Sequence, residues 1–443
     1  MRPETGMDLL ETLRSAARPL EGGRADFDAL LDRIGNSRFV FLGEASHGSH
    51  EFYRTRAEIT RRLISEKGFH AVAVEGDWPS AYRVNRFVKG NDAIEDAEEA
   101  LSEFRRFPTW MWRNADVLDF VGWLRESNAG RAPSERTGFY GLDLYSMHES
   151  IAAVLEHLDS TDREAAERAR KRYSCFDHFG GDPQAYGYAA AAGMTESCED
   201  AVVAQLTELR QRTLSSALAR NEETFSAEQN ARLVRNAEEY YRAMFRGRVS
   251  SWNLRDRHMF ETLEALERYL GAPRTAPRIV VWAHNSHVGD ARATQMGQSG
   301  ELNIGQLARE RWGREVTLVG FTTHHGTVMA ASEWDAPAER KRVRPSAPRS
   351  YEALFHAVGI ERFFLDVSGN RDVAAALREA RLERAIGVIY RPETEMESHY
   401  FFAQLSEQFD AVIHYDVTRA VEPLERFAPV PAGELPETYP SGV

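Results

Sequence analysis

Eight short runs of apolar residues constrain the fold of this chain more than any other feature. They lack the polar–apolar alternation of a half-exposed strand, so they are typical of strands buried on both faces of a helix-covered sheet. Helical patterns stand between many of them, for example at 51–66, 115–125 and 351–358. This alternation predicts an α/β fold with a mainly parallel sheet flanked by helices. The eight runs are 38–43, 70–75, 137–142, 278–283, 316–321, 363–367, 386–390 and 411–415.

One long stretch breaks the alternation of strands and helices. Between about 150 and 271 we find no convincing strand pattern, but long segments rich in Ala, Arg, Glu and Leu, such as 200–218 and 227–245. We interpret this stretch as a large all-helical insertion into the α/β core. The charged, Pro-containing segment 330–350 is predicted to be a long surface loop. The predicted domains are the first half of the α/β core (1–149), the helical insertion (150–271), the second half of the core (272–425) and a Pro-rich tail (426–443).

The composition excludes several functional classes. A net charge of −13 over 443 residues argues against a nucleic-acid partner, which usually binds a basic surface. No apolar stretch approaches the roughly 18 residues of a membrane helix, and no targeting segment is visible, so we expect no membrane partner and a cytoplasmic location. The two cysteines, Cys175 and Cys198, fit a reducing compartment and exclude both a disulfide framework and a four-thiolate zinc site.

Acids and histidines follow the predicted strands at the points where the strands end. In open α/β sheets, ligands bind outside the carboxyl ends of the strands. Any one such residue is more typical of an ordinary loop, but here a whole set converges without a compensating lysine. Four strands therefore deliver these side chains to one edge of the sheet: Glu44, His47, Glu75, Asp143, His284 and His287.

Arg56 adds a positive charge to this edge. It lies at i+4 of the apolar helical stripe that begins at Phe52, so it is predicted to face inward. A buried arginine needs carboxylate partners, and Glu44 and Glu75 are the nearest candidates. The alternative is an arginine whose stem crosses the stripe and whose head reaches solvent.

The chemistry that these residues permit is hydrolysis by water. The chain has no Gly-x-Ser-x-Gly elbow, no Gly-x-Gly-x-x-Gly turn and no P-loop, so neither a serine hydrolase nor a nucleotide cofactor is supported. A histidine flanked by carboxylates can act as a general base on water, and an arginine or a second histidine can stabilise an oxyanion. This combination favours direct hydrolysis of an ester or a lactone.

Two alternatives use the same residues. His47 with His50, and His284 with His287, form His-x-x-His pairs that could hold a divalent metal together with the nearby glutamates, giving a metal-dependent hydrolase of another bond. Such pairs in loops are a weak signal, and we expect no cofactor. A non-catalytic binding protein is the other alternative, but it would not need a base-competent histidine.

An aromatic cluster at 104–114 contains Trp110, Trp112 and Arg113. It is either a plug under the sheet or an apolar wall for a bulky substrate.

At these motifs the sequence resembles the erythromycin esterase family, over about 25–425. The matching blocks are Leu42-Gly-Glu-Ala-Ser-His-Gly48, Val74-Glu-Gly-Asp-Trp-Pro79, Phe104–Asn114, Gly141–Ser146, Trp282-Ala-His-Asn-Ser-His-Val-Gly-Asp290, Asn303-Ile-Gly305 and Arg391–Tyr400.

This resemblance implies an α/β core with a helical insertion and a deep cleft, and water-mediated hydrolysis without a serine nucleophile. It also implies that His47 is the general base and that Glu75 is its partner. The implied substrate is a small molecule, with a macrolide or another bulky lactone as candidates. We predict catalytic roles for His47, Glu75, Glu44, Arg56 and His284, and substrate contacts for His287, His50, Asp143, Trp110, Trp112 and Arg113.

Overall fold

A nine-stranded sheet forms the centre of the described part of the chain. The computed structural model describes residues 4–90, 94–179, 182–215, 221–245, 247–272 and 276–425. The strand order is β1-β8-β11-β6-β2-β5-β3-β4, with β7 paired to β6 beside this path. All pairings from β11 to β4 are parallel, whereas β1, β7 and β8 pair antiparallel, so the predicted mainly parallel α/β sheet is confirmed.

The strands coincide with seven of the eight predicted apolar runs. A parallel strand has both faces covered, which explains why these runs show no alternation. Their bounds are β1 (Arg18–Pro19), β2 (Phe39–Leu42), β3 (Ala71–Asp77), β4 (Gly138–Asp143), β5 (Ile279–Trp282), β6 (Val316–Ala330), β7 (Glu339–Val343), β8 (Arg362–Asp366) and β11 (Ala411–Thr418), while β9 (Arg381–Arg384) and β10 (Tyr400–Ala403) form a separate pair.

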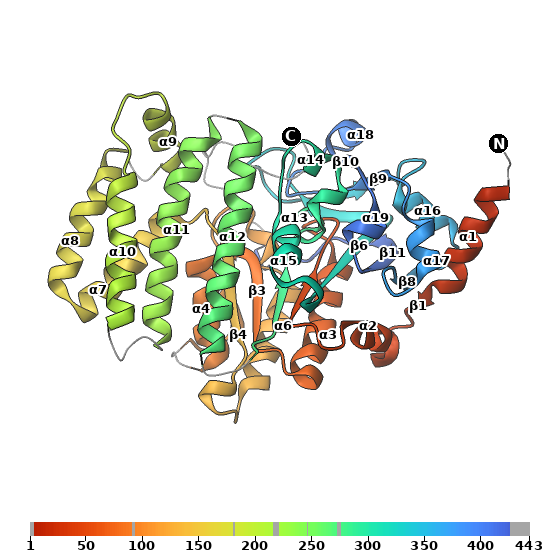
Figure 1. Cartoon of the computed structure of the whole chain (residues 1–443), viewed down its shortest axis with the longest axis horizontal. Helices are drawn as coiled ribbons and strands as arrows, with labels where there is room; N and C mark the ends of the chain where they lie inside the picture. The colour runs from red at the N-terminus through yellow and green to blue at the C-terminus, as the bar shows by residue number, and fades with distance from the viewer. Residues whose placement is uncertain are drawn as a thin grey trace.

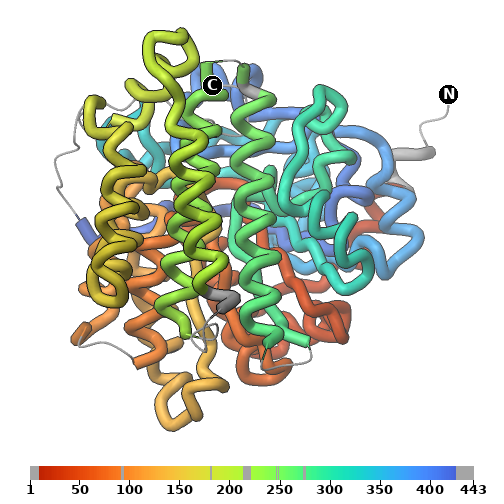
Figure 2. Tube along the Cα trace, turned by 60° about the vertical axis from the view of Figure 1, so that its left-hand side comes forward, coloured from red at the N-terminus to blue at the C-terminus, as the bar shows by residue number. Residues whose placement is uncertain are grey.

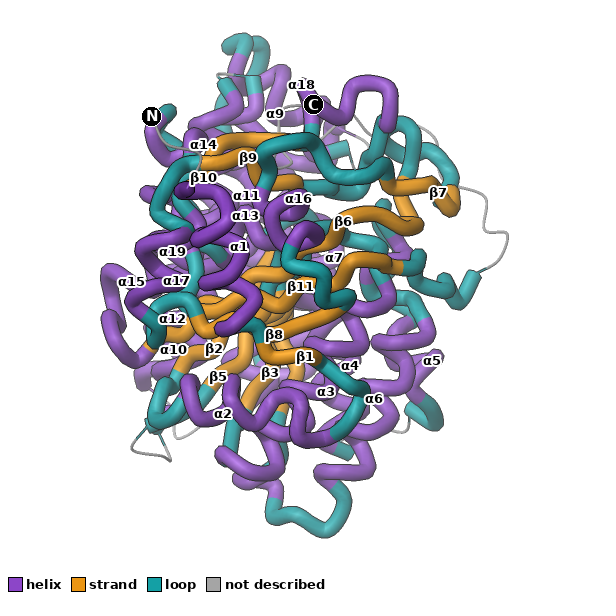
Figure 3. The backbone as a smooth tube through the Cα atoms, turned by 90° about the vertical axis from the view of Figure 1, so that its right-hand side faces the viewer, coloured by secondary structure: helices purple, strands orange, loops and turns teal. Residues whose placement is uncertain are grey.

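Helices cover both faces of the sheet (Figure 3). The two large hydrophobic cores lie between these helices and the strands. Alternate residues of β2 belong to different cores: Phe39 and Phe41 to one, Val40 and Leu42 to the other. Helices α2 (Asp28–Ile34), α3 (His50–Lys67) and α6 (Ala115–Asn128) pack on one face, and α1 (Glu4–Ala16), α12 (Arg248–Gly271), α15 (Ile304–Trp312) and α16 (Tyr351–Ala357) on the other.

The described residues between 150 and 271 form helices without a strand, as predicted. The long helices stand side by side at one end of the molecule (Figures 1 and 2). The last of them, α12, also packs on β4, so this region reaches the edge of the sheet. The helices are α7 (Met147–Thr161), α8 (Arg163–Tyr173), α9 (Pro183–Ala191), α10 (Glu199–Ser215), α11 (Glu222–Met244) and α12.

Two predictions about local structure are wrong. The run 386–390 makes only isolated bridges, because Ile386 pairs with the loop after β2 and Ile389 with the end of β6. The segment 330–350 is not a long loop, since β7 lies within it and pairs with the extended end of β6. The residues of β7 are mostly charged because β7 is an edge strand, and charged side chains suit an exposed edge.

Cys175 and Cys198 are joined by a disulfide, with their Cα atoms 6.0 Å apart, so the expectation of two reduced cysteines is wrong. Their separation of 23 residues gives no sequence signal for this pairing, because the helical region brings them together. The predicted Pro-rich tail at 426–443 lies outside the described residues. No described helix is both long and apolar enough to cross a membrane.

Candidate active site

The carboxyl ends of four adjacent parallel strands bring the predicted acids and histidines together. Glu44 and His47 lie in the loop after β2, Glu75 near the end of β3 and Asp143 at the end of β4. The turn after β5 leads into α13 (Asn285–Val288) and carries both other histidines. The predicted charged side chains of the site are all buried, with at most 4% of each residue exposed: Glu44, His47, Arg56, Glu75, Asp143, His284 and His287.

The first half of the site is a chain of contacts from Arg56 to His47. Arg56 faces inward from α3, and its Nη2 lies 3.0 Å from Oε2 of Glu44. The other oxygen of Glu44 lies 3.0 Å from Nδ1 of His47. Because a carboxylate only accepts hydrogen bonds, this contact assigns the proton of His47 to Nδ1. Nε2 of His47 therefore has a free lone pair, and this buried atom has no hydrogen-bond partner among the residues that the structure describes.

The second half of the site is centred on Glu75. Its Oε1 lies 3.8 Å from Nε2 of His47 and 2.7 Å from Nη2 of Arg255 on α12. Of the two candidate partners of Arg56, the structure thus pairs it with Glu44, whereas the arginine beside Glu75 comes from the helical region. Burial opposes the ionisation of Glu75, but His287, His47 and Arg255 together hold its pKa well below the usual value.

His287 is supported by Asp256, the neighbour of Arg255 on α12. Its Nδ1 lies 2.9 Å and 3.0 Å from the two oxygens of Asp256, and its Nε2 lies 3.3 Å from Oε1 of Glu75. Trp252, one turn earlier on α12, stacks on the imidazole ring. Burial and the like charge of Arg255 disfavour the imidazolium, but the carboxylates of Asp256 and Glu75 outweigh both and raise the pKa of His287 to about 9.

His284 is a neutral hydrogen-bond donor beside His47. Its Nδ1 accepts from the backbone N–H of Ser286 at 3.3 Å, which places its proton on Nε2. Burial and the neighbouring His47 lower the pKa of His284 well below the usual value. The two rings lie 4.8 Å apart, so a proton acceptor and a proton donor share one buried space.

The comparisons with known proteins agree with the sequence resemblance. A sequence model of the family described as "Erythromycin esterase" matches residues 64–418. The chain belongs to the erythromycin esterase family. This is a family of hydrolases, and the buried acids and histidines described above are therefore found in a chain whose relatives are hydrolases.

Two relatives and one solved structure resemble this chain at low sequence identity. Erythromycin esterase type II of Escherichia coli is 23% identical over 323 residues, covering 69% of this chain and 73% of that protein. YbfO of Bacillus subtilis is 22% identical over 417 residues, covering 90% and 88%. A crystal structure of a Bacillus cereus protein has a TM-score of 0.80 and 20% identity, covering 95% of this chain and 99% of that one. At this identity the likeness supports the fold alone.

Sequence reasoning missed the contribution of α12, although the signal is present. Trp252, Met259 and Leu263 form an apolar stripe at i, i+7 and i+11, and Arg255 and Asp256 stand on it at i+3 and i+4. This is the same signal that identified Arg56: a charged residue on the inward stripe of a helix. The Arg-Asp pair lies in the region that we interpreted only as a helical insertion.

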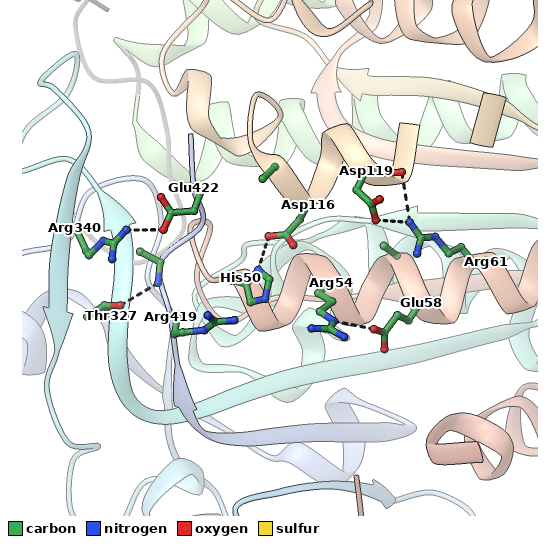
Figure 4. Close-up of a pocket in the computed structure, with 13 residues that line it drawn as sticks. His50, Arg54, Glu58, Arg61, Asp116, Asp119, Thr327, Arg340, Arg419 and Glu422 are labelled. Atoms are coloured by element: carbon green, nitrogen blue, oxygen red, sulfur yellow. Dashed lines mark hydrogen bonds and ion pairs between the residues drawn. The ribbon is translucent and has the colours of Figure 1, made fainter. Parts of the chain in front are cut away.

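His50 does not join the buried cluster. It is the first residue of α3, and its Nδ1 is 2.9 Å from Asp116 (Figure 4). It lines a separate cavity of about 470 Å³ together with charged side chains such as Arg54 and Arg419. The arginines of this cavity are paired: Arg54 with Glu58, Arg61 with Asp119, Arg340 with Glu422, and Arg419 with Glu51.

The aromatic cluster contributes Trp112 to the site but not the other two predicted residues. Trp112 donates its indole N–H to the carbonyl of Glu75 at 3.2 Å. It also lines a cavity of about 60 Å³ that reaches Glu75, and the structure shows this small space where the resemblance implied a deep cleft. Trp110 is buried against Phe107, and Arg113 pairs with Glu425.

The raised pKa of His287 predicts a pH-dependent stability. Because the folded pKa of about 9 exceeds the ordinary histidine pKa of 6.5, the stabilisation is complete below pH 6.5 and is lost as the pH rises through about 9. The expected loss is about 3 kcal/mol of unfolding free energy. Denaturant titrations at both ends of this range should show it, and Asp256→Asn should flatten the dependence.

The matched control for this experiment is Asp410→Asn. Asp410 is also buried and charge-paired, with Arg309, but it lies away from the histidines. Its variant should lose stability at every pH and keep the wild-type slope. Equal slopes for the wild type and Asp256→Asn would show that Asp256 does not hold the proton of His287.

Proposed function

We propose that this chain hydrolyses a carboxylic ester or a lactone by a water molecule that His47 activates, without a serine nucleophile. One observation carries the proposal: the lone pair of Nε2 of His47 stands 3.8 Å from Oε1 of Glu75 in a buried site. Both atoms are hydrogen-bond acceptors, and their separation is too long for a direct hydrogen bond. It suits a water molecule that donates one hydrogen to each.

Such a water is oriented for attack. Because both of its hydrogens are engaged, its lone pairs point away from His47 and Glu75 and can reach the carbonyl carbon of a substrate. Glu75 is a poor proton acceptor, since its pKa is held well below the usual value. The proton therefore passes to Nε2 of His47, whose other nitrogen is already fixed by Glu44.

The charge of the buried cluster favours this proton transfer. The cluster holds four carboxylates and three cations, so it carries one negative charge in excess before the reaction. A proton on His47 removes this excess, which stabilises the imidazolium formed in the transition state. The carboxylates are Glu44, Glu75, Asp143 and Asp256, and the cations are Arg56, Arg255 and protonated His287.

His284 is suited to stabilise the oxyanion of the tetrahedral intermediate. Its Nε2 has no hydrogen-bond partner within 3.5 Å among the described residues, and its ring lies 4.8 Å from that of His47. A neutral hydrogen-bond donor in a buried site has no counter-ion to lose before it stabilises a developing negative charge. We therefore assign His47 as the base and His284 as the oxyanion donor.

The substrate class follows from the walls of the cavity and from the family. Aromatic side chains, among them Phe104, Phe107 and Trp112, form one part of the lining of the space beside Glu75 and charged side chains the rest, so the aromatic part favours an apolar acyl or alcohol group. A relative is named erythromycin esterase type II, which makes a macrolide or another bulky lactone a candidate substrate. Screening esters and lactones for products that have gained the mass of one water tests the proposal. A screen across both classes without turnover would contradict it.

His47→Ala should lower the turnover number of an identified substrate by about 10²–10⁴-fold, because a positioned general base contributes that much. The control is His414→Asn, which alters a buried histidine of β11 that contacts Thr322 and Asp416 instead. Measuring the turnover number of both folded variants tests whether His47 is the general base. Near wild-type turnover by His47→Ala would remove His47 from the role of base.

We also propose that the reaction needs no metal ion. Glu44 and Glu75 each have an arginine within 3.0 Å, and these guanidinium groups would repel a divalent cation. Dialysis against a chelator should therefore leave turnover unchanged. If activity disappears on dialysis and returns when zinc or manganese is added, a metal-dependent reaction would replace this account.

A further inference from the structure

A second carboxyl group lines the cavity beside Glu75. Asp77 lies two residues further along β3, and a register shift between Val74 and Asp77 places it opposite Asp143. It is also the residue before α4 (Trp78–Lys89), where an aspartate commonly caps the helix. Its side chain makes no capping hydrogen bond, so the carboxyl is not used for helix capping.

The surroundings of Asp77 differ from those of Glu75. One oxygen accepts from the backbone N–H of Ser146 at 3.1 Å, and the other lies 3.8 Å from Nε of Arg106, beyond hydrogen-bond distance. Burial raises its pKa to about 7; Arg106 acts against this shift, while the charges of Asp143 and Glu149 add to it. One cavity therefore contains an ionised carboxylate, Glu75, and a carboxyl that keeps a proton near neutral pH.

We propose that Asp77 is the general acid that protonates the leaving alcohol oxygen, an inference that rests on the proposed ester hydrolysis. It stands at the same cavity as Glu75 but is not part of the Arg56–Glu44–His47 chain of contacts. Base and acid are then separate groups: His47 takes a proton from water, and Asp77 gives one to the alcohol.

The proton balance of the reaction is complete with these two residues. The water oxygen forms a bond to the carbonyl carbon while one of its protons moves to Nε2 of His47, and the carbonyl oxygen becomes the oxyanion. When the intermediate collapses, the bond between the carbonyl carbon and the alcohol oxygen breaks and that oxygen takes the proton of Asp77. The products are an acid and an alcohol, and the proton on His47 returns to Asp77 through solvent.

Asp77→Asn tests this role, because the amide oxygen can still accept from Ser146 while no acidic proton remains. The probes are two esters of one acid, an alkyl ester with a basic leaving alkoxide and a p-nitrophenyl ester whose phenolate leaves without protonation. The variant should lose about 10²–10⁴-fold in turnover of the alkyl ester and less than about 10-fold for the p-nitrophenyl ester. Wild-type turnover of the alkyl ester should fall as the pH rises through about 7, and the variant should lack this fall.

The control variant is Asp116→Asn, which removes a carboxylate at the separate cavity near His50 and should leave both rates unchanged. Equal losses on the two esters would show that Asp77 acts only through the shape of the site, and an unchanged alkyl-ester rate would exclude it from the reaction. If the wild-type protein hydrolyses neither these esters nor any lactone, the proposed function fails first. If it hydrolyses both esters, only the role of Asp77 is at stake.

Discussion

Carboxylates buried at the carboxyl edge of the sheet must be neutralised by cations that the fold carries there. Arg56 reaches Glu44 from α3, and Arg255 reaches Glu75 and Asp143 from α12. A charge removed from water costs several kcal/mol unless it is paired, so each arginine fixes the position of the helix that bears it. The position of α12 across the strand ends is thus determined by the ion pairs of the site as well as by hydrophobic packing.

His47 and His287 differ in their ability to accept a proton because the groups that they contact differ. His47 contacts Glu44 through Nδ1, and Glu44 also pairs with an arginine, while Nε2 of His47 has no hydrogen-bond partner in the described part of the chain. His287 contacts Asp256 at one nitrogen and Glu75 at the other, and its pKa rises to about 9. One ring is thereby free to accept a proton, whereas the other keeps one. Glu75 lies between them, and the positive charges around it hold its pKa well below the usual value.

The sequence predicted the parts of this site that local patterns encode. Glu44 and His47 lie in the loop after one apolar run, Glu75 ends another, and Arg56 stands on an apolar helical stripe, so local patterns placed them. Arg255 could not be assigned to Glu75 in this way, since the docking of a distant helix on the sheet depends on tertiary packing. The same limit explains the extension of β6 and the disulfide, whose partners meet only in the folded chain.

The central claim is that Glu44 holds the proton of His47 on Nδ1 and leaves Nε2 as the acceptor. Nitrogen-15 NMR of the labelled imidazoles, assigned with His47→Gln, measures this tautomer directly. The account predicts a protonated Nδ1 and an unprotonated Nε2 near neutral pH, and a loss of this preference in Glu44→Gln. A proton on Nε2 of His47 in the wild-type protein, or the same tautomer in both proteins, would contradict it.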